Sequence, residues 1–236
     1  MIAALRAARL GAVTALITRD DFGGMAANDG PVPVRTLAQA ARLMRETQQL
    51  PRYGIRSADA TLDYQRLLAR VSEVTGEARR RSLLRHELDE VGAEVHEHAG
   101  TVRFLGPDTL DAEAVGPVHA NKIILCPGGA SRRLPVPGFA LTATHSDAWH
   151  LQAVPPSLLV IGAGATGVQV ATIFDAFGAQ VRLVEAGPRI LMTEDEDVSQ
   201  AVADALSDGG IDVTTNVGTV ERLTRIGGRP PDKQVP

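Results

Sequence analysis

Three glycines at fixed spacing constrain this chain more than any other feature. Gly162, Gly164 and Gly167 follow directly on an apolar run, Ser157–Ile161, and a helical pattern then continues to Phe177. Gly162 permits a sharp turn off a strand, Gly164 leaves the backbone open to close approach, and Gly167 lets the helix pack against the strand. This order predicts a strand, a glycine-rich turn and a helix, the opening of a β-α-β unit.

The end of this unit carries an acidic residue. A second strand is expected at Val181–Val184, and Glu185 follows it, about 20 residues past the first glycine, where an acid binds the ribose of a dinucleotide. The glycine pattern alone also occurs in purely structural turns, but strand, glycines, helix, strand and acid in register predict a site for the ADP half of a dinucleotide. The carboxylate would repel a 2′-phosphate and so favours NAD(H), although Arg189 leaves NADP(H) open.

A second helix and strand follow the acid. The acidic run Glu194–Asp197 is typical of a helix N-terminus, the helix is expected to reach Ser207, and Gly209-Gly210 should end it before a strand at Ile211–Thr215. We interpret the acids as partners of the helix dipole rather than as metal ligands.

The first half of the chain also alternates between helical and strand periods. Helices are expected at Met1–Leu10, Thr36–Glu46, Leu62–Thr75 and Arg79–Val91, and strands at Val13–Thr18, Ala93–His98, Val102–Leu105 and Ile123–Leu125. This alternation predicts an α/β fold with a largely parallel sheet. Because residues 130–156 are rich in proline and glycine, we expect a linker there, between domains spanning 1–148 and 149–236.

Composition excludes several classes of function. The 236 residues include 24 Lys and Arg against 28 Asp and Glu, with no basic stripe, so nucleic acid is not an expected partner. No apolar run is long enough to cross a membrane, and we predict a soluble, cytoplasmic protein. The single cysteine, Cys126, cannot form an internal disulfide, and no Cys/His spacing of a metal site occurs, so no metal is expected.

The motifs resemble a known family. Leu159–Gly167, Val184–Leu191 and Glu194–Glu196 are similar to the NAD domain of the flavoprotein disulfide reductases, above all dihydrolipoamide dehydrogenases and mercuric reductases. Leu5–Gly11, Asp21–Gly24, Lys122–Gly129 and Pro135–Gly138 resemble parts of the family's FAD domain and its exit. The resemblance implies two Rossmann-like, three-layer domains, the first incomplete at its N-terminus and the second at its C-terminus. It also implies that FAD, if held, lies against Gly23, Gly24, Gly128 and Gly129.

The departures from the family are equally informative. Ala26 and Pro31 stand where the family has its two redox cysteines, and Thr18 stands where an acid is expected. The resemblance therefore implies hydride transfer from NAD(P)H to flavin and on to an unknown acceptor, such as a quinone or a dye, without dithiol chemistry, and it assigns no catalytic residue. The first glycine loop and the dimer domain of the family have no counterpart, so the oligomeric state is not carried over. A non-catalytic NAD-binding remnant or interaction protein from a truncated gene is the alternative.

Five further residues are candidate site residues. Cys126 is interpreted as a buried apolar thiol rather than a reactive one. His96 and His98 are expected on one face of a strand, as solvated histidines rather than a metal pair. His145 and His150, which flank Trp149, could face a nicotinamide, but an ordinary linker role is favoured.

Overall fold

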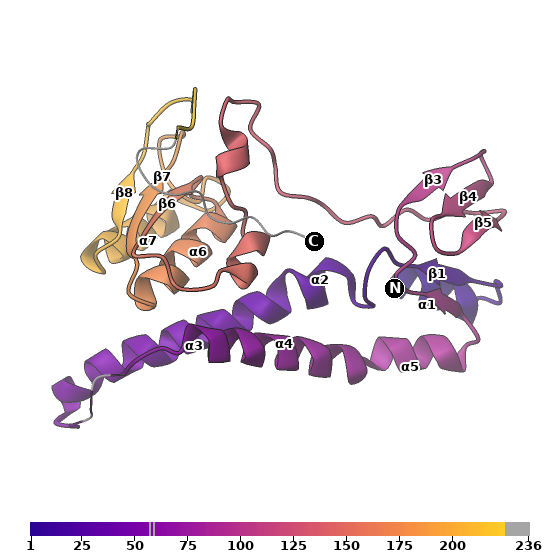
Figure 1. The fold of residues 1–236 in the computed structure, drawn as a ribbon, viewed down its shortest axis with the longest axis horizontal. Helices are drawn as coiled ribbons and strands as arrows, with labels where there is room; N and C mark the ends of the chain where they lie inside the picture. The colour runs from indigo at the N-terminus through magenta and orange to yellow at the C-terminus, as the bar shows by residue number, and fades with distance from the viewer. Residues whose placement is uncertain (57, 59, 225–236) are drawn as a thin grey trace. The chain divides into compact units, whose positions relative to one another are not determined.

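The computed structural model describes residues 1–56, 58 and 60–224, and these form two compact units (Figure 1). Unit 1 comprises Met1–Gln39 and Arg66–Gly129, and unit 2 comprises Ala40–Gln65 and Ala130–Pro236. The fold class is confirmed, since both units combine helices with parallel strands. The domain boundary expected near Ala148 stays a prediction, which limited proteolysis can test.

Unit 1 is built around a short parallel pair of strands. Its elements are α1 (Ile2–Arg9), β1 (Ala15–Ile17), α2 (Gly24–Asn28), the start of α3 (Pro31–Gln49), most of α4 (Tyr64–Arg80), α5 (Leu83–Glu90), β2 (Glu94–His96), β3 (Val102–Phe104), β4 (Thr109–Ala112) and β5 (Gly116–His119). β1 pairs with β2 in parallel, with Ala15 opposite Glu94. Leu5 and Leu88 pack with Phe22 in the core, which fixes α1, α5 and the loop after β1 together.

α3 and α4 are longer than the helices expected there, and the break between α4 and α5 lies at a different residue. α3 begins at Pro31 and reaches Gln49, and α4 continues through Gly76 to Arg80. The break expected between Thr75 and Arg79 was therefore wrong. Gly76 does not end α4, because a single glycine inside a helix costs only about 1 kcal/mol. The break between the two helices lies near Ser82 instead.

Two expectations about the strands of unit 1 are corrected by the structure. β3, β4 and β5 form an antiparallel meander, so this part of the sheet structure is not parallel. The run Ile123–Leu125 forms no strand, and Ile124 is 65% exposed. An apolar run becomes a strand only where a neighbouring strand accepts its hydrogen bonds, and no described strand pairs with this one. Cys126 at its end is exposed, so the buried thiol was a wrong interpretation.

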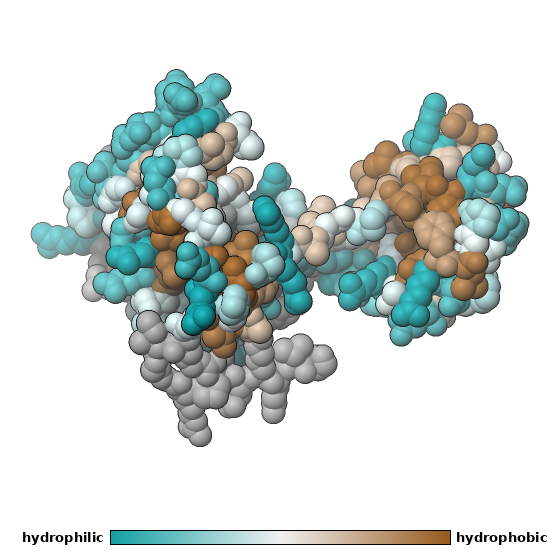
Figure 2. Space-filling model, turned by 90° about the horizontal axis from the view of Figure 1, so that it is seen from above, coloured by the Kyte–Doolittle hydropathy of each residue, from teal (hydrophilic) through white to brown (hydrophobic). Residues whose placement is uncertain are grey.

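Apolar side chains also reach the surface on the meander of unit 1. Val102 and Phe104 lie on β3 and are exposed, and Leu105 follows them. Figure 2 shows apolar residues gathered on the surface of each unit. None of the helices in the described part of the chain combines the length and the apolar character of a membrane span.

Unit 2 contains the β-α-β unit that the glycines predicted. Its main elements are β6 (Ser157–Ile161), α6 (Ala165–Ala176), β7 (Gln180–Val184), α7 (Glu196–Asp208) and β8 (Asp212–Thr214), with short 3₁₀ turns at Leu50–Tyr53, Phe139–Leu141 and Ser146–His150. The strands are parallel in the order β6-β7-β8. The predicted order of strand, helix and strand is therefore confirmed, with bounds that differ by one or two residues.

An aromatic cluster fills the core of unit 2 beside α6. Tyr64 lies with its ring centroid 6.1 Å from that of Phe177 and 6.4 Å from that of Phe174. Its hydroxyl donates a hydrogen bond to the carbonyl oxygen of Ala148 at 2.8 Å, and burial raises the pKa of Tyr64 to about 12. Arg45 of α3 donates to the carbonyl oxygen of Thr172 at 2.9 Å, which ties the end of α3 to α6.

Candidate functional site

The glycine loop of unit 2 leaves β6 at Gly162 and enters α6 at Gly164. Gly162 has φ +98°, a left-handed conformation that favours glycine, and its N–H donates to the carbonyl oxygen of Val184 at 2.8 Å. Gly164 is the N-cap of α6, and no atom lies within 4 Å of the position that a Cβ would take there. The backbone at Gly164 is therefore open to a close approach from outside.

Gly167 is required by packing and not by its backbone angles. A Cβ at Gly167 would lie only 1.9 Å from the carbonyl oxygen of Gly162, a distance that no side chain can occupy. The first turn of α6 therefore packs directly on the turn that leaves β6. The N–H groups of that first turn have no partners within the helix.

Glu185 lies at the carboxyl end of β7, beside the glycine loop. Its Oε2 accepts a hydrogen bond from the N–H of Ala163 at 2.7 Å, and its Oε1 accepts one from the N–H of Gly187 at 2.9 Å. A carboxylate has about four acceptor positions, so these two bonds leave one on each oxygen. Two acceptor positions of the Glu185 carboxylate therefore stay free, one for each of the two hydroxyls of a ribose.

Arg189 is half-buried in the loop that follows β7. Its Nη1 donates to the carbonyl oxygens of Leu191 (3.3 Å) and Glu194 (2.8 Å) and to the hydroxyl of Ser199, and its Nη2 donates to the carbonyl oxygen of Met192 (3.3 Å). The guanidinium thus binds its own loop and the start of α7. The acidic residues expected at a helix start, Glu196 and Asp197, do lie in the first turn of α7.

The glycines of unit 1 form two loops that lie close to Met25. Gly23 (φ +108°) and Gly24 (φ +57°) open α2, and Gly23 has no room for a side chain, because a Cβ would lie 2.5 Å from that of Ala27. The Cε atom of Met25 is 3.7 Å from the Cβ position of Gly128 and 3.9 Å from that of Gly129. The structure therefore brings together the two glycine pairs that the resemblance singled out.

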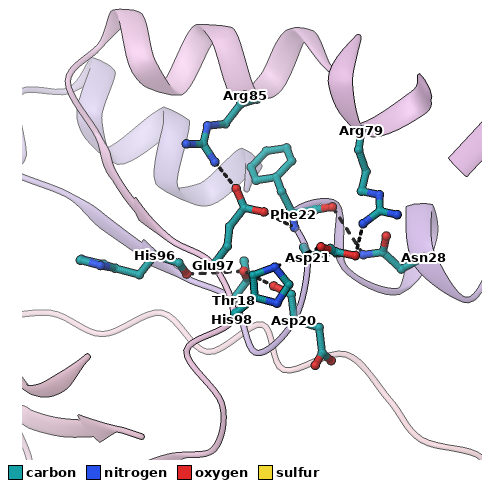
Figure 3. A network of polar contacts seen from close by, with 10 residues as sticks. All are labelled: Thr18, Asp20, Asp21, Phe22, Asn28, Arg79, Arg85, His96, Glu97 and His98. Atoms are coloured by element: carbon teal, nitrogen blue, oxygen red, sulfur yellow. Dashed lines mark hydrogen bonds and ion pairs between the residues drawn. The ribbon is translucent and has the colours of Figure 1, made fainter. Parts of the chain in front are cut away.

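A network of charged residues holds the loop between β1 and α2 (Figure 3). Oε2 of Glu97 accepts from the N–H of Phe22 at 2.8 Å, and its Oε1 pairs with Arg85. Asp21 pairs with Arg79 and lies 3.2 Å from Nε2 of His98. These bonds fix the path of the chain into Gly23.

The two histidines near this network do not share a strand face. β2 ends at His96, whose Nε2 lies 3.1 Å from Glu94, and His98 has φ +55° in the turn that follows. Potential ligand atoms of Asp21, Glu97 and His98 lie within 4.8 Å of one another. Both carboxylates already pair with arginines, and the positive charges of these arginines oppose a bound cation.

The remaining predicted positions are placed as follows. Ala26 is exposed in α2, and Pro31 is the first residue of α3, so the segment of the expected cysteine pair is helical at both ends. His145 lies 3.3 Å from the hydroxyl of Ser131. The side chains of Trp149 and His150 lie outside the described part of the structure, as does the C-terminal segment 225–236.

Sequence reasoning missed several residues of the site. Ser199 is only 1% exposed and takes part in the Arg189 network, while Leu191 has φ +48° and binds the glycine loop through its N–H. Neither residue carries a sequence signal, because serine and leucine are ordinary in a loop and in a helix. Glu97 was missed for the same reason, since a single glutamate after a strand predicts nothing by itself.

Comparisons with known proteins agree with this geometry. The family model described as pyridine nucleotide-disulphide oxidoreductase matches residues 1–227. Dihydrolipoyl dehydrogenase of Zymomonas mobilis is 34% identical over 234 residues, which are 94% of this chain and 48% of the relative. Mercuric reductase of Bacillus cereus is 27% identical over 226 residues, which are 95% of this chain and 35% of the relative.

A solved structure gives the same result. The HOCl-induced flavoprotein disulfide reductase RclA of Escherichia coli, in its Cu(II) complex, is 26% identical with a TM-score of 0.77, covering 96% of this chain and 48% of that one. The chain spans about half the length of the Zymomonas relative and of this neighbour. With a family model matching nearly all of its residues, the chain belongs to the pyridine nucleotide-disulphide oxidoreductase family.

Proposed function

We propose that unit 2 binds the ADP half of NAD(H) at the glycine loop and that the chain is a flavin-dependent NAD(P)H oxidoreductase that works without a cysteine pair. The observation that carries the proposal is the position of Glu185. Its carboxylate binds the N–H groups of Ala163 and Gly187 and keeps one acceptor position free on each oxygen. The ribose hydroxyls would donate to these positions, while the diphosphate would meet the open backbone at Gly164 and the N–H groups of α6.

The same carboxylate supports NAD(H) over NADP(H). A 2′-phosphate would bring negative charge beside Glu185, whose own charge is not paired with a cation among the described residues. Arg189 would have to compensate, but its guanidinium binds carbonyl oxygens of its own loop. Repulsion between close like charges therefore favours the coenzyme without the phosphate.

The residues of unit 1 fit a bound FAD in two respects. Gly24 has no atom within 4 Å of its Cβ position, so the backbone there is open. Oδ1 of Asn28 is buried without a hydrogen-bond partner in the described part of the chain, while its Nδ2 holds the carbonyl oxygens of Asp21 and Phe22. We propose that Gly23-Gly24 and Gly128-Gly129 would hold FAD, which when bound supplies a hydride acceptor.

Two positions at which the family has redox cysteines hold no sulfur in this chain, which supports a route for the electrons after the flavin that does not use a cysteine pair. Ala26 and Pro31 offer no thiolate, and Cys126, the single cysteine of the sequence, has no second cysteine in the chain with which to form a disulfide. Electrons would therefore pass directly to an external acceptor. Quinones and dyes are the acceptor classes to assay first.

Titration of the whole chain with NADH tests the nucleotide site. We expect saturable heat of binding for the unaltered protein and a loss of about 1.5–3 kcal/mol for Glu185→Ala, the size of hydrogen bonds to a charged group. Asp212→Asn is the matched control, because it removes one carboxylate from the same sheet at the start of β8. Absence of heat with NADH and with NADPH would refute the proposal.

The visible spectrum after incubation with FAD tests the second half of the proposal. A flavin band that persists through gel filtration, and that bleaches when NADH is added, is the expected result. Retention of NADH binding without any flavin band would instead indicate a nucleotide-binding protein that is not an oxidoreductase.

A further inference from the structure

The loop after β7 is tied to the glycine loop by a single peptide group. Leu191 adopts φ +48°, and its N–H donates a hydrogen bond to the carbonyl oxygen of Ala163 at 2.8 Å. Left-handed backbone is unfavourable for a residue with a side chain, by about 1–2 kcal/mol, so neighbouring contacts must hold Leu191 in place. The hydrogen bonds of the Leu191 carbonyl oxygen supply that restraint.

The carbonyl oxygen of Leu191 accepts a hydrogen bond from the N–H of Glu194 at 2.8 Å and is also held by two side chains. It accepts from Nη1 of Arg189 at 3.3 Å and from the hydroxyl of Ser199 at 3.2 Å. The same hydroxyl accepts from Nη1 of Arg189, and Ser199 is only 1% exposed. Arg189, Ser199 and Leu191 therefore form one connected group, which we name the Leu191 clasp.

Ala163 transmits this restraint to the glycine loop. It is fully buried between Gly162 and Gly164, and both of its main-chain groups are bound. Its N–H donates to Glu185 and its carbonyl oxygen accepts from Leu191. Hydrogen bonds from two sides therefore fix the orientation of the peptide groups of Ala163, between Gly162 and Gly164. This orientation sets the direction in which the N–H groups of the following residues point.

We propose that Arg189 and Ser199 are positioning residues that hold the glycine loop in the form that binds a dinucleotide, and that Arg189 does not bind a 2′-phosphate. The inference rests on the proposed nucleotide site. The two hydrogens of Nη1 already serve three acceptors, and Nη2 serves a fourth, the carbonyl oxygen of Met192. Movement of the guanidinium toward a phosphate would release Leu191 and, with it, Ala163.

Two variants test this role by NADH titration of the full chain. Arg189→Lys keeps the charge but loses the planar arrangement of donors, and Ser199→Ala removes a buried hydroxyl. Each removes about one net hydrogen bond from the clasp, so we expect NADH affinity to fall about 10-fold in each variant. The matched control is Arg182→Lys on β7, whose exposed side chain pairs with Asp212, and its NADH affinity should be unchanged.

The competing role gives a different result in the same experiment. If Arg189 binds a 2′-phosphate, then Arg189→Lys leaves NADH affinity unchanged and weakens NADPH alone. That outcome, or unchanged NADH affinity in both variants, overturns the proposal.

Amide hydrogen exchange tests the clasp without any ligand. In Ser199→Ala we expect faster exchange at Leu191 and Ala163, while the urea midpoint and the exchange of α6 and β7 stay near those of the unaltered protein. A general loss of stability would instead accelerate exchange throughout unit 2, and that result would also overturn the proposal. If the unaltered chain binds no NADH, the proposed function fails, but local exchange at Ala163 still decides whether the clasp exists.

Discussion

Replacing Gly167 by alanine should separate the folding role of this glycine from the binding role proposed for Gly164. The added Cβ would lie 1.9 Å from the carbonyl oxygen of Gly162 and 3.1 Å from its carbonyl carbon. Both are backbone atoms, so no change of rotamer relieves the overlap. The first turn of α6 would have to move away from β6 by more than 1 Å, roughly the shortfall against van der Waals contact.

The cost follows from what such a movement breaks. Overpacking a well-filled core costs about 1–3 kcal/mol, and the rigid neighbour places Gly167→Ala near 3 kcal/mol. For a protein of this size this corresponds to a fall in Tm of about 6–12 °C. NADH binding should be lost as well, because the N–H groups of the first turn are displaced together with the helix.

Gly164→Ala is the matched control, because the same methyl group meets open space there. Alanine is a poor N-cap, so a smaller loss of about 1 kcal/mol is expected. NADH affinity should still fall sharply, since the methyl group would occupy the place proposed for the diphosphate. Urea unfolding followed by circular dichroism gives the stabilities, and calorimetry gives the affinities. If Gly167→Ala costs no more stability than Gly164→Ala, the close packing of helix and strand is refuted.

Three further changes probe other parts of the chain. Burial raises the pKa of Tyr64 to about 12, so the unfolded state ionises first and the free energy of unfolding should fall as the pH rises from about 10 to 12. In urea unfolding, Tyr64→Phe should abolish this pH dependence. Below pH 10 the variant should lose about 1 kcal/mol of stability, because the hydrogen bond to Ala148 is missing. Exposed Cys126 should react with a thiol reagent at nearly the same rate in the native and the urea-unfolded protein, and strong protection in the native state would contradict its exposure. Glu97→Gln should destabilise unit 1 by about 1–3 kcal/mol, whereas Glu94→Gln, at a surface pair with His96, should cost less than about 0.5 kcal/mol.

The elements of unit 2 were predictable because their signals are local. The turn at Gly162, the packing at Gly167 and the period of α6 all depend on residues within one β-α-β unit. A short stretch of sequence therefore contains both the pattern and its structural cause. The same holds for the acids at the start of α7, where the helix dipole acts within one turn.

Unit 1 was less predictable because its strands depend on partner strands outside their own segment. The run Ile123–Leu125 has the composition of a buried strand, but it forms none, and Cys126 is exposed with it. The meander shows the opposite case, since Gly116 and Pro117 are typical of a turn and yet lie in β5, paired with β4. Pairing decides both outcomes, and whether a segment finds a partner strand is not encoded in that segment alone.

The proposed nucleotide site combines both kinds of information. Glu185 was predicted as a ribose ligand from its place after a strand, but its bonds to Ala163 and Gly187 were not. They follow from the parallel sheet, which brings the carboxyl ends of β6 and β7 to the same edge and so places the acid beside the glycine turn. A residue proposed to bind the sugar therefore also orients the peptide that precedes the proposed phosphate-binding turn, so recognition of the sugar and of the phosphate should weaken together in Glu185→Ala.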